Sequence, residues 1–343
     1  MMKVAWALLL CSVLLLSACK SGGQTVSDGG FIGGTNGLEM SWVTGAPPAM
    51  VQDAGQYDFS VALQLENVGE SDVGRDSENS DNYYGSIELI GLDPAQFSNP
   101  VMFRTFDDDD ISMQGKRRAG IDIIPGGTGV MYFEGFNYLP DVFGSQDHTL
   151  RANLCYDYMT YTNSKVCIKD NPNERVDDNS ICTLAGAKDV KNSGAPLQVT
   201  SVQQRPAGKD KIGVSFVIEN LGPGKVFRRS DQQTNRGYTP CYDPYAGNAN
   251  YNKVWVKVSF PNDQYSNLIE CKNLRGNFAS NEGEVTMFEG TPATVDCTIL
   301  TDPSKGRTYT STLNIDLKYT YLRYIEMPLT VEDTSAGSTT RVN

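Results

Sequence analysis

The chain has 343 residues and a formal net charge of −12 at pH 7, and 39% of its residues are hydrophobic. An acidic surface repels phosphate groups, so this charge argues against nucleic acids and anionic lipid headgroups as partners. At about 150 residues per domain, the length predicts two domains. Glycine, tyrosine, asparagine, aspartate and threonine recur between short apolar runs, which favours strands and turns over helices.

The N-terminal segment has the features of an export signal. Lys3 precedes an apolar run over 4–16, which is too short to span a bilayer. The sequence Leu-Ser-Ala-Cys over 16–19 follows and resembles the bacterial lipoprotein box. This resemblance implies that residues 1–18 are a signal peptide and that Cys19 becomes the lipidated first residue of the mature chain.

The residues after the cysteine predict how the protein is held on a membrane. Residues 19–36 are rich in glycine and serine and are expected to form a flexible tether between the lipid anchor and the folded part. Lys20 follows the cysteine in place of the aspartate that retains bacterial lipoproteins at an inner membrane. We therefore expect an exported protein at the outer membrane or the cell surface.

Three blocks of sequence occur twice in the same order. Residues 59–69 match 212–222, and the two blocks share a Glu-Asn-x-Gly ending. Residues 130–135 match 285–290, and residues 150–158 match 313–321 at an offset of 163 positions. These repeats predict an all-β protein with two tandem antiparallel β-sandwiches, one over 37–190 and one over 191–343 that ends in a polar tail.

The third block predicts which side chains face the core. Its apolar positions share one strand face, and the polar positions between them, including Asn153, Asp157 and Asp316, share the other. The next strands, 165–168 and 328–331, are expected to fold back as a hairpin, turning near residue 161 in the first copy. The inward positions are Leu150, Ala152, Leu154, Tyr156 and Tyr158, and Leu313, Ile315, Leu317, Tyr319 and Tyr321.

Six cysteines besides Cys11 and Cys19 predict up to three disulfides in an exported protein. The expected hairpin places Cys155 opposite Cys167, and Cys182 is the alternative partner of Cys167. In the second copy we expect a Cys271–Cys297 bridge. Zinc binding is not expected, because the chain lacks a Cys-x-x-Cys pair. The six candidates are Cys155, Cys167, Cys182, Cys241, Cys271 and Cys297.

Two acidic loops could hold calcium, the one cofactor that the sequence leaves open. One loop contains Asp72, Asp76, Glu78 and Asp81, and the other is the run of aspartates over 107–110. Their carboxylates are hard oxygen ligands, although neither loop matches the EF-hand pattern. The alternative is that both loops are solvated and bind no ion.

An aromatic group surrounds a segment that is present only in the second copy. Aromatic rings with Asn, Gly and Pro suit the binding of a surface protein or a glycan. The alternative is that the loop packs on its own sandwich. The group consists of Tyr238, Tyr242, Tyr245, Tyr251 and Trp255.

His148 is the only histidine, so it is the only candidate base for a Ser-His-Asp or Cys-His hydrolase. It lies in a polar stretch before a strand, and we interpret it as a solvated turn residue. We therefore do not expect an enzyme.

The turns at 67–69 and 220–222, each after an alternating strand, resemble those of immunoglobulin-like sandwiches in prokaryotic surface proteins. The closest resemblance is to the cell-adhesion-related bacterial domain called CARDB. Residues 31–38 and 206–211 are also similar to segments of an uncharacterised family of prokaryotic surface proteins. The resemblance implies two immunoglobulin-like sandwiches and no particular activity.

Taken together, these features predict a non-catalytic cell-surface lipoprotein with a structural, adhesive or partner-binding role. The alternative is a lipoprotein-derived subunit of an extracellular filament or pilus that self-assembles by β-strand donation. Residues 30–42 or the C-terminal tail are the candidate donor strands.

Overall fold

The computed structural model describes residues 30–74, 85–173, 181–229, 241, 250–261, 268–276, 279–288, 291–304 and 306–334. Within these ranges the secondary structure is strand, apart from a 3₁₀ turn, η1 (Phe106–Asp109). Residues 31–343 cluster as one compact unit. The predicted all-β class is confirmed, and the expected signal peptide and Cys19 lie outside the described residues.

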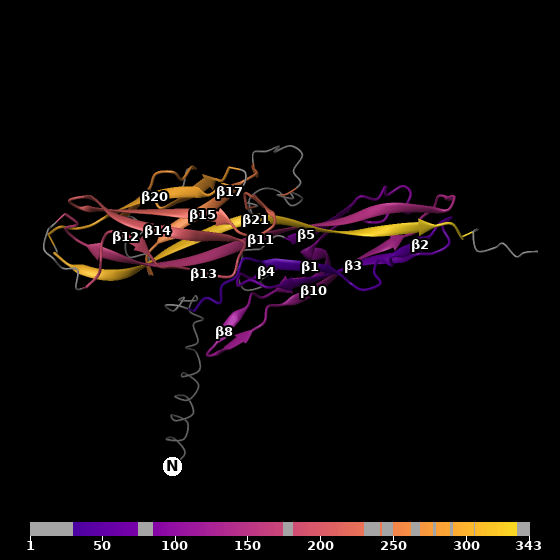
Figure 1. Ribbon diagram of the computed structural model, residues 1–343, viewed down its shortest axis with the longest axis horizontal. Helices are drawn as coiled ribbons and strands as arrows, with labels where there is room; N and C mark the ends of the chain where they lie inside the picture. Colours follow the sequence, from indigo (N-terminus) through magenta and orange to yellow (C-terminus); the bar gives the residue numbers. More distant parts are fainter. Residues whose placement is uncertain are drawn as a thin grey trace, which may run out of the picture. The chain divides into compact units, whose positions relative to one another are not determined.

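The first sandwich packs a three-stranded sheet against part of a nine-stranded sheet (Figure 1). The smaller sheet has the order β1 (Leu38–Trp42), β3 (Phe59–Asn67), β10 (Thr128–Phe136). Opposite it lie β5 (Gly85–Ile90), β6 (Phe103–Thr105) and β2 (Met50–Gln52), together with halves of two longer strands. Two short ribbons complete this region: β4 (Val73–Gly74) with β7 (Ser112–Met113), and β8 (Arg117–Ala119) with β9 (Asp122–Ile124).

The second sandwich uses a five-stranded sheet and the other part of the nine-stranded sheet. The five-stranded sheet has the order β12 (Gly186–Lys188), β14 (Leu197–Gly208), β15 (Lys211–Asn220), β20 (Ala293–Leu300), β18 (Ile269–Cys271). Opposite it lie β19 (Glu282–Thr286) and β17 (Lys253–Ser259), with β13 (Val190–Asn192) and β16 (Lys225–Phe227) beside the long strands.

The two longest strands run through both sandwiches. β11 (Ser145–Lys169) and β21 (Thr308–Glu332) have 25 residues each and pair antiparallel over their whole length (Figure 1). The predicted hairpin is therefore wrong, because Tyr161 lies inside β11 and pairs with Asp316. Each strand continues straight because it pairs over its whole length with the long strand of the other repeat. Each sandwich thus contains half of both long strands and does not coincide with one consecutive stretch of chain.

The pairing of β11 with β21 follows the internal repeat. Asp157 and Thr320 are equivalent positions, 163 residues apart, and they pair with each other in the middle of the ladder. Thr320 Oγ1 donates a hydrogen bond to Asp157 Oδ1 (2.5 Å), and Arg229 Nε lies 3.9 Å from Asp157 Oδ2. An approximate twofold axis through this pair relates the two repeats, which exchange their last strand halves.

The ten apolar positions of the third sequence block are all buried, as predicted. The opposite strand face is less exposed than expected, because Asn153 and Asp157 are buried as well. Beside them on the same strand, Cys155 is covered by its disulfide to Cys241. This face of the ladder centre is therefore a second packed surface.

The predicted equivalence of residues 130–135 and 285–290 is wrong. Met131 of β10 pairs with Leu63, and Val295 of β20 pairs with Phe216, which is the repeat equivalent of Leu63. The counterpart of β10 is therefore β20. Val285 lies in β19, which pairs with β17 at the edge of the other sheet. Short alternating strands have similar sequences wherever they lie in a sandwich, so the match did not identify the position.

Four buried tyrosines hold the turns of the two repeats at the middle of the molecule. Tyr158 OH donates to Asn67 Oδ1 (3.0 Å), and Tyr321 OH donates to the equivalent Asn220 Oδ1 (3.2 Å). Tyr156 and Tyr319 OH accept hydrogen bonds from the first backbone amides of β1 and β14, at 3.1 and 3.4 Å. Burial raises the pKa of all four phenols, so they stay neutral hydrogen-bonding groups.

Candidate functional site

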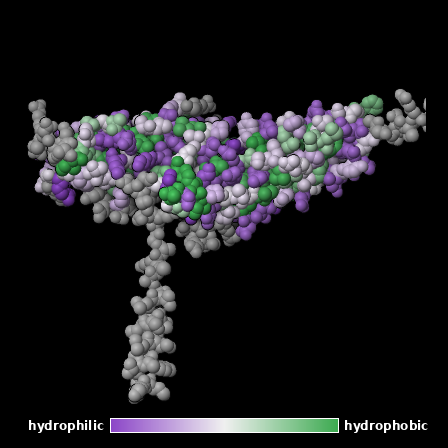
Figure 2. Space-filling view, turned by 60° about the horizontal axis from the view of Figure 1, so that its bottom comes forward, coloured by the Kyte–Doolittle hydropathy of each residue, from purple (hydrophilic) through white to green (hydrophobic). Residues whose placement is uncertain are grey.

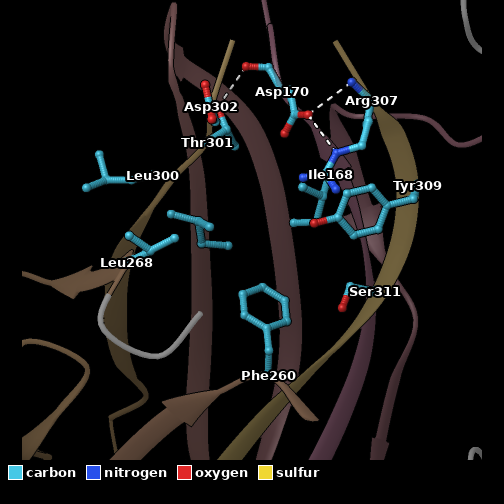
Figure 3. A pocket seen from close by; sticks show the side chains of 11 residues that line it. Ile168, Asp170, Phe260, Leu268, Leu300, Thr301, Asp302, Arg307, Tyr309 and Ser311 are labelled. Carbon is cyan, nitrogen blue, oxygen red and sulfur yellow. Dashed lines mark hydrogen bonds and ion pairs between the residues drawn. The ribbon is translucent and has the colours of Figure 1, made fainter. Parts of the chain in front are cut away.

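A pocket opens at the far end of the second sandwich, where β11 and β20 end and β21 begins (Figure 3). Its volume is about 280 Å³. Phe260 lies at its base, and Asp170 and Arg307 lie at its rim (Figure 3). The lining is apolar on the walls and polar at the rim, and it consists of Ile168, Asp170, Phe260, Leu268, Ile299, Leu300, Thr301, Asp302, Arg307, Tyr309 and Ser311.

The rim of the pocket is held by an ion pair between two strand ends. The backbone amide of Arg307 and its Nε donate to Asp170 Oδ2 at 3.0 and 3.2 Å. Asp170 is buried, and its carbonyl accepts from Thr301 Oγ1 at 3.0 Å. These bonds fix the rim before anything binds. A cavity just below the ligand-pocket range of roughly 300–1,000 Å³ suits a small apolar group or a single side chain of a partner.

The equivalent end of the first sandwich is filled by aromatic rings. His148 occupies the repeat position of Ser311. Its ring packs edge to face against Phe97 and Tyr138, with ring centroids 5.4 and 5.9 Å apart. The interpretation of His148 as a solvated turn residue is therefore wrong. Burial lowers the pKa of His148, and its Nε2 has no hydrogen-bond partner within the described part of the chain. These contacts give His148 a packing role.

Three aspartates that the sequence analysis did not single out meet at this end. Carboxylate oxygens of Asp53, Asp141 and Asp333 lie within 4.8 Å of one another. Asp53 accepts from the amides of Val142 and Thr334, both at 2.9 Å, and these bonds lower its pKa to about 2. The pKa of Asp141 is raised, because its carboxyl shares a hydrogen bond and charge repulsion with Asp53.

The aspartate group has the oxygen ligands that calcium prefers. However, the Asp53 carboxylate already accepts three hydrogen bonds, two from Thr334 and one from Val142, so an ion would bind mainly through Asp141 and Asp333. No sequence signal could have found the group, because its members come from three separate loops.

The calcium loops predicted from sequence are partly described. Asp72 accepts from the Gly115 amide (2.7 Å) and pairs with Arg117 (2.8 Å), while Asp76, Glu78 and Asp81 lie outside the described residues. In the other loop, Asp108 accepts from the Thr105 amide (2.7 Å), and Asp109 pairs with Arg104 (2.8 Å). The described carboxylates thus stabilise turns, and calcium at these loops stays a prediction.

The predicted aromatic group is only partly described, because Tyr238, Tyr242 and Tyr245 lie outside the described residues. Tyr251 packs against Phe227 with ring centroids 5.3 Å apart, and Trp255 lies under Lys318 Nζ at 4.9 Å. These two rings pack on their own sandwich.

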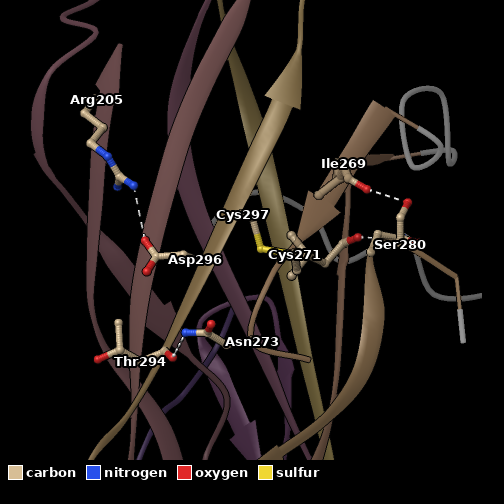
Figure 4. Close-up of a disulfide and its surroundings, with 10 residues drawn as sticks. Arg205, Ile269, Cys271, Asn273, Ser280, Thr294, Asp296 and Cys297 are labelled. Carbon is tan, nitrogen blue, oxygen red and sulfur yellow. Dashed lines mark hydrogen bonds and ion pairs between the residues drawn. A yellow bond between two sulfur atoms is a disulfide. The ribbon is translucent and has the colours of Figure 1, made fainter. Parts of the chain in front are cut away.

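Three disulfides connect the six cysteines. The predicted Cys155–Cys167 pair is wrong, because both residues lie on the straight strand β11, twelve positions and about 40 Å apart. Cys155 instead pairs with Cys241, and Cys167 pairs with Cys182, which was the alternative. The expected Cys271–Cys297 bridge is confirmed and links neighbouring strands β18 and β20 (Figure 4). Such a set of bridges is typical of exported proteins.

Comparison with known proteins gives no family. No protein-family model and no curated protein matches the chain. A solved structure, the secreted serine protease VesC from Vibrio cholerae, is similar at 11% identity and a TM-score of 0.17 over 82% of this chain. The match covers 50% of that protease chain, so this chain spans about half its length, and a score this low carries no argument.

Among the described residues, no helix has the length and hydropathy to cross a membrane.

Proposed function

We propose that this protein is a non-catalytic, lipid-anchored protein of the outer membrane or cell surface that presents the open end of its second sandwich to a partner. Cys19 would carry the anchor. The partner would be a surface protein or a glycan that places a small apolar group in the pocket and polar groups on its rim.

The observation that supports this proposal best is the continuous ladder of β11 and β21. A ladder of 25 paired residues spans about 80 Å, and it leaves no hinge between the sandwiches. Such a body keeps its binding surfaces in fixed positions, which suits a structural or adhesive protein. The fixed rim of the pocket is a second support, because a preformed site loses little entropy on binding.

Filament formation is the alternative. One of its two candidate donor strands, residues 30–42, already pairs within its own sandwich. Within residues 30–42, β1 pairs with β3 of its own sandwich, and the amides of Ile32 and Gly33 donate to Glu70 at 2.9 Å. The C-terminal tail remains as a donor, but Ala336 and Val342 are its only apolar residues after Thr334. Donor strands insert alternate apolar side chains, so this tail is a poor candidate.

Electron microscopy of surface material from the native host, with mass spectrometry of the N-terminus, tests the anchor and the assembly. We expect dispersed protein whose first residue is an acylated Cys19. Ordered filaments of subunits cut after Cys19 would contradict the proposal and support the pilus-like alternative.

The pocket is tested by filling it. Ser311→Phe places a ring in the cavity, and Thr310→Phe places the same ring on the exposed face of the same strand as a control. Binding of the displayed protein to glycan and peptide arrays should fall at least tenfold for Ser311→Phe alone. Equal binding by both variants and the wild type would show that the pocket is not the partner site.

A further inference from the structure

The β8–β9 hairpin is a ribbon that projects from the body (Figure 1). All six strand residues are exposed, and Ile121 at the turn is 94% exposed. Gly120 adopts a positive φ of +65° and opens the two-residue turn. Figure 2 turns this side forward and shows a compact hydrophobic patch in the middle of the face. On the hairpin itself, Ile121, Ile123 and Ile124 are exposed. Contiguous exposed apolar groups mark interaction sites.

The two faces of the hairpin differ in charge and in their contacts. Arg117 and Ile124 pair across the ribbon, and Arg117 is fastened to Asp72 by an ion pair of 2.8 Å. Arg118 and Ile123 pair on the opposite face, and Lys116 lies directly before the ribbon. The hairpin and the residue before it therefore combine the cations Lys116 and Arg118 with exposed isoleucines, although the whole chain is acidic.

The base of the hairpin lies where the chain leaves for the predicted anchor. The Lys116 amide donates to the Gly69 carbonyl (2.7 Å), and the next residue, Glu70, accepts from the amides of Ile32 and Gly33. A glycine- and serine-rich tether of twelve links, which the sequence predicts between Cys19 and Phe31, would have an r.m.s. span of about 20 Å. The ribbon from Lys116 to its tip at Ile121 reaches about 17 Å. A tether of this kind would leave the described part of the chain beside the base of the hairpin and would have a reach similar to that of the ribbon.

We propose that this hairpin is a second membrane contact, which inserts its isoleucines between acidic lipid headgroups of the bilayer that holds the anchor. Lys116 and Arg118 would bind the headgroups, while Ile121 and Ile123 would enter the boundary with the acyl chains. The proposal rests on the lipid anchor of the proposed function. The acidic surface argues against anionic lipids as partners of the protein as a whole, and this hairpin is a local exception.

Vesicle sedimentation tests the contact without the anchor. The unlipidated mature chain, residues 20–343, contains the compact unit 31–343 and is mixed with vesicles of phosphatidylglycerol and phosphatidylcholine. We expect measurable binding that falls at least fivefold in the triple variant Ile121→Ser, Ile123→Ser, Ile124→Ser. The variant Lys116→Gln, Arg118→Gln should lose the preference for anionic over neutral vesicles. Salt at 1 M should weaken wild-type binding, because it screens charges beyond about 3 Å.

Phe288→Ser is the matched control, because it removes an exposed ring of 76% exposure elsewhere in the chain. An equal loss of binding in this control, or equal binding by the wild type and the triple variant, would overturn the proposal. Sedimentation velocity without lipid separates one further case: self-association that the triple variant abolishes would make the hairpin a contact between copies instead.

The anchor is measured separately, by palmitate labelling of the full chain and its Cys19→Ser variant in cells. Absent labelling with intact vesicle binding would reject the anchor and leave the hairpin as a lipid contact. Labelling of the wild type with no vesicle binding would reject the hairpin contact alone.

Discussion

The far ends of the two sandwiches have the same backbone frame and different contents. Asp333 donates its amide to the Gly144 carbonyl, and the repeat-equivalent Asp170 donates to the Arg307 carbonyl, both at 2.9 Å. Between these fixed points, the first end is closed by Phe97, Tyr138 and His148, whereas the second end is a pocket. The pocket therefore comes from the side chains and loops that each repeat carries, and not from the sandwich fold.

The same contrast is seen along the edges of the long strands. In the first sandwich, β2 pairs in parallel with β21 at Thr330 and covers its edge. At the equivalent Cys167 in the second sandwich, the side-chain amide of Gln204 bonds the backbone N–H and C=O at 3.0 and 2.5 Å. The buried side chain of Gln204 thus bonds the backbone position whose equivalent pairs with β2 in the first sandwich. The segment that carries β2 also places Asp53 at the first end. Among the described residues, the aspartate group is therefore found at this end and not at the second.

The largest expected loss of stability comes from removing a ring at the far end of the first sandwich. Phe97→Ala should lower the free energy of unfolding by about 4 kcal/mol, because Phe97 is fully buried among rings. Phe260→Ala should cost less, about 2 kcal/mol, because Phe260 already borders a cavity and loses fewer contacts. Urea unfolding measures both. Equal losses would mean that the two ends are packed alike.

The Asn turns give the next contrast. Asn67 makes four hydrogen bonds through its side chain, to Ser71, Met113, Gly69 and Tyr158, whereas two are seen for the partly exposed Asn220. Asn67→Ala should cost about 3 kcal/mol, and Asn220→Ala about half as much, because fewer buried groups lose their partner. Thermal unfolding of the two variants would rank them, and the reverse order would contradict the described hydrogen bonds.

A pH-dependent contrast separates Asp316 from its repeat equivalent, Asn153. Burial raises the pKa of Asp316 to about 6, so folding loses stability as pH rises from about 4 to 6. Asp316→Asn should therefore stabilise the protein by about 2 kcal/mol at pH 8 and leave it unchanged at pH 4. Asn153→Asp is the reciprocal control and should destabilise at pH 8. A stability gain that is the same at both pH values would exclude the titration of Asp316 as its cause.

Asp53→Asn should produce the smallest change in stability. Its pH dependence should be opposite to that of Asp316→Asn. The pKa of Asp53 is lowered to about 2 by backbone N–H donors, so its contribution is present above pH 4 and is lost as pH falls toward 2. Asp53→Asn should flatten acid unfolding in this window at the first end. The same flattening in Asp93→Asn, an acid of a neighbouring surface loop, would show that the effect is not specific to Asp53.

Sequence reasoning succeeded where the signal is local. The alternation of Leu150 to Tyr158 identified the buried strand face, and the Glu-Asn-x-Gly endings identified equivalent turns at Asn67 and Asn220. The Cys271–Cys297 bridge was also predicted correctly. The pocket could not be predicted from the sequence, because its walls come from strand ends that are distant in sequence.

By itself, the sequence determined the all-β class, the internal duplication and the inward side chains, because alternation and repetition are properties of neighbouring residues. Only the tertiary structure decided which strand pairs with which. A period of two is satisfied equally by a hairpin within one repeat and by a long strand shared between repeats. The exchange of strand halves, the Cys155–Cys241 bridge and the different contents of the two ends all follow from that choice, which depends on contacts between residues far apart in the chain.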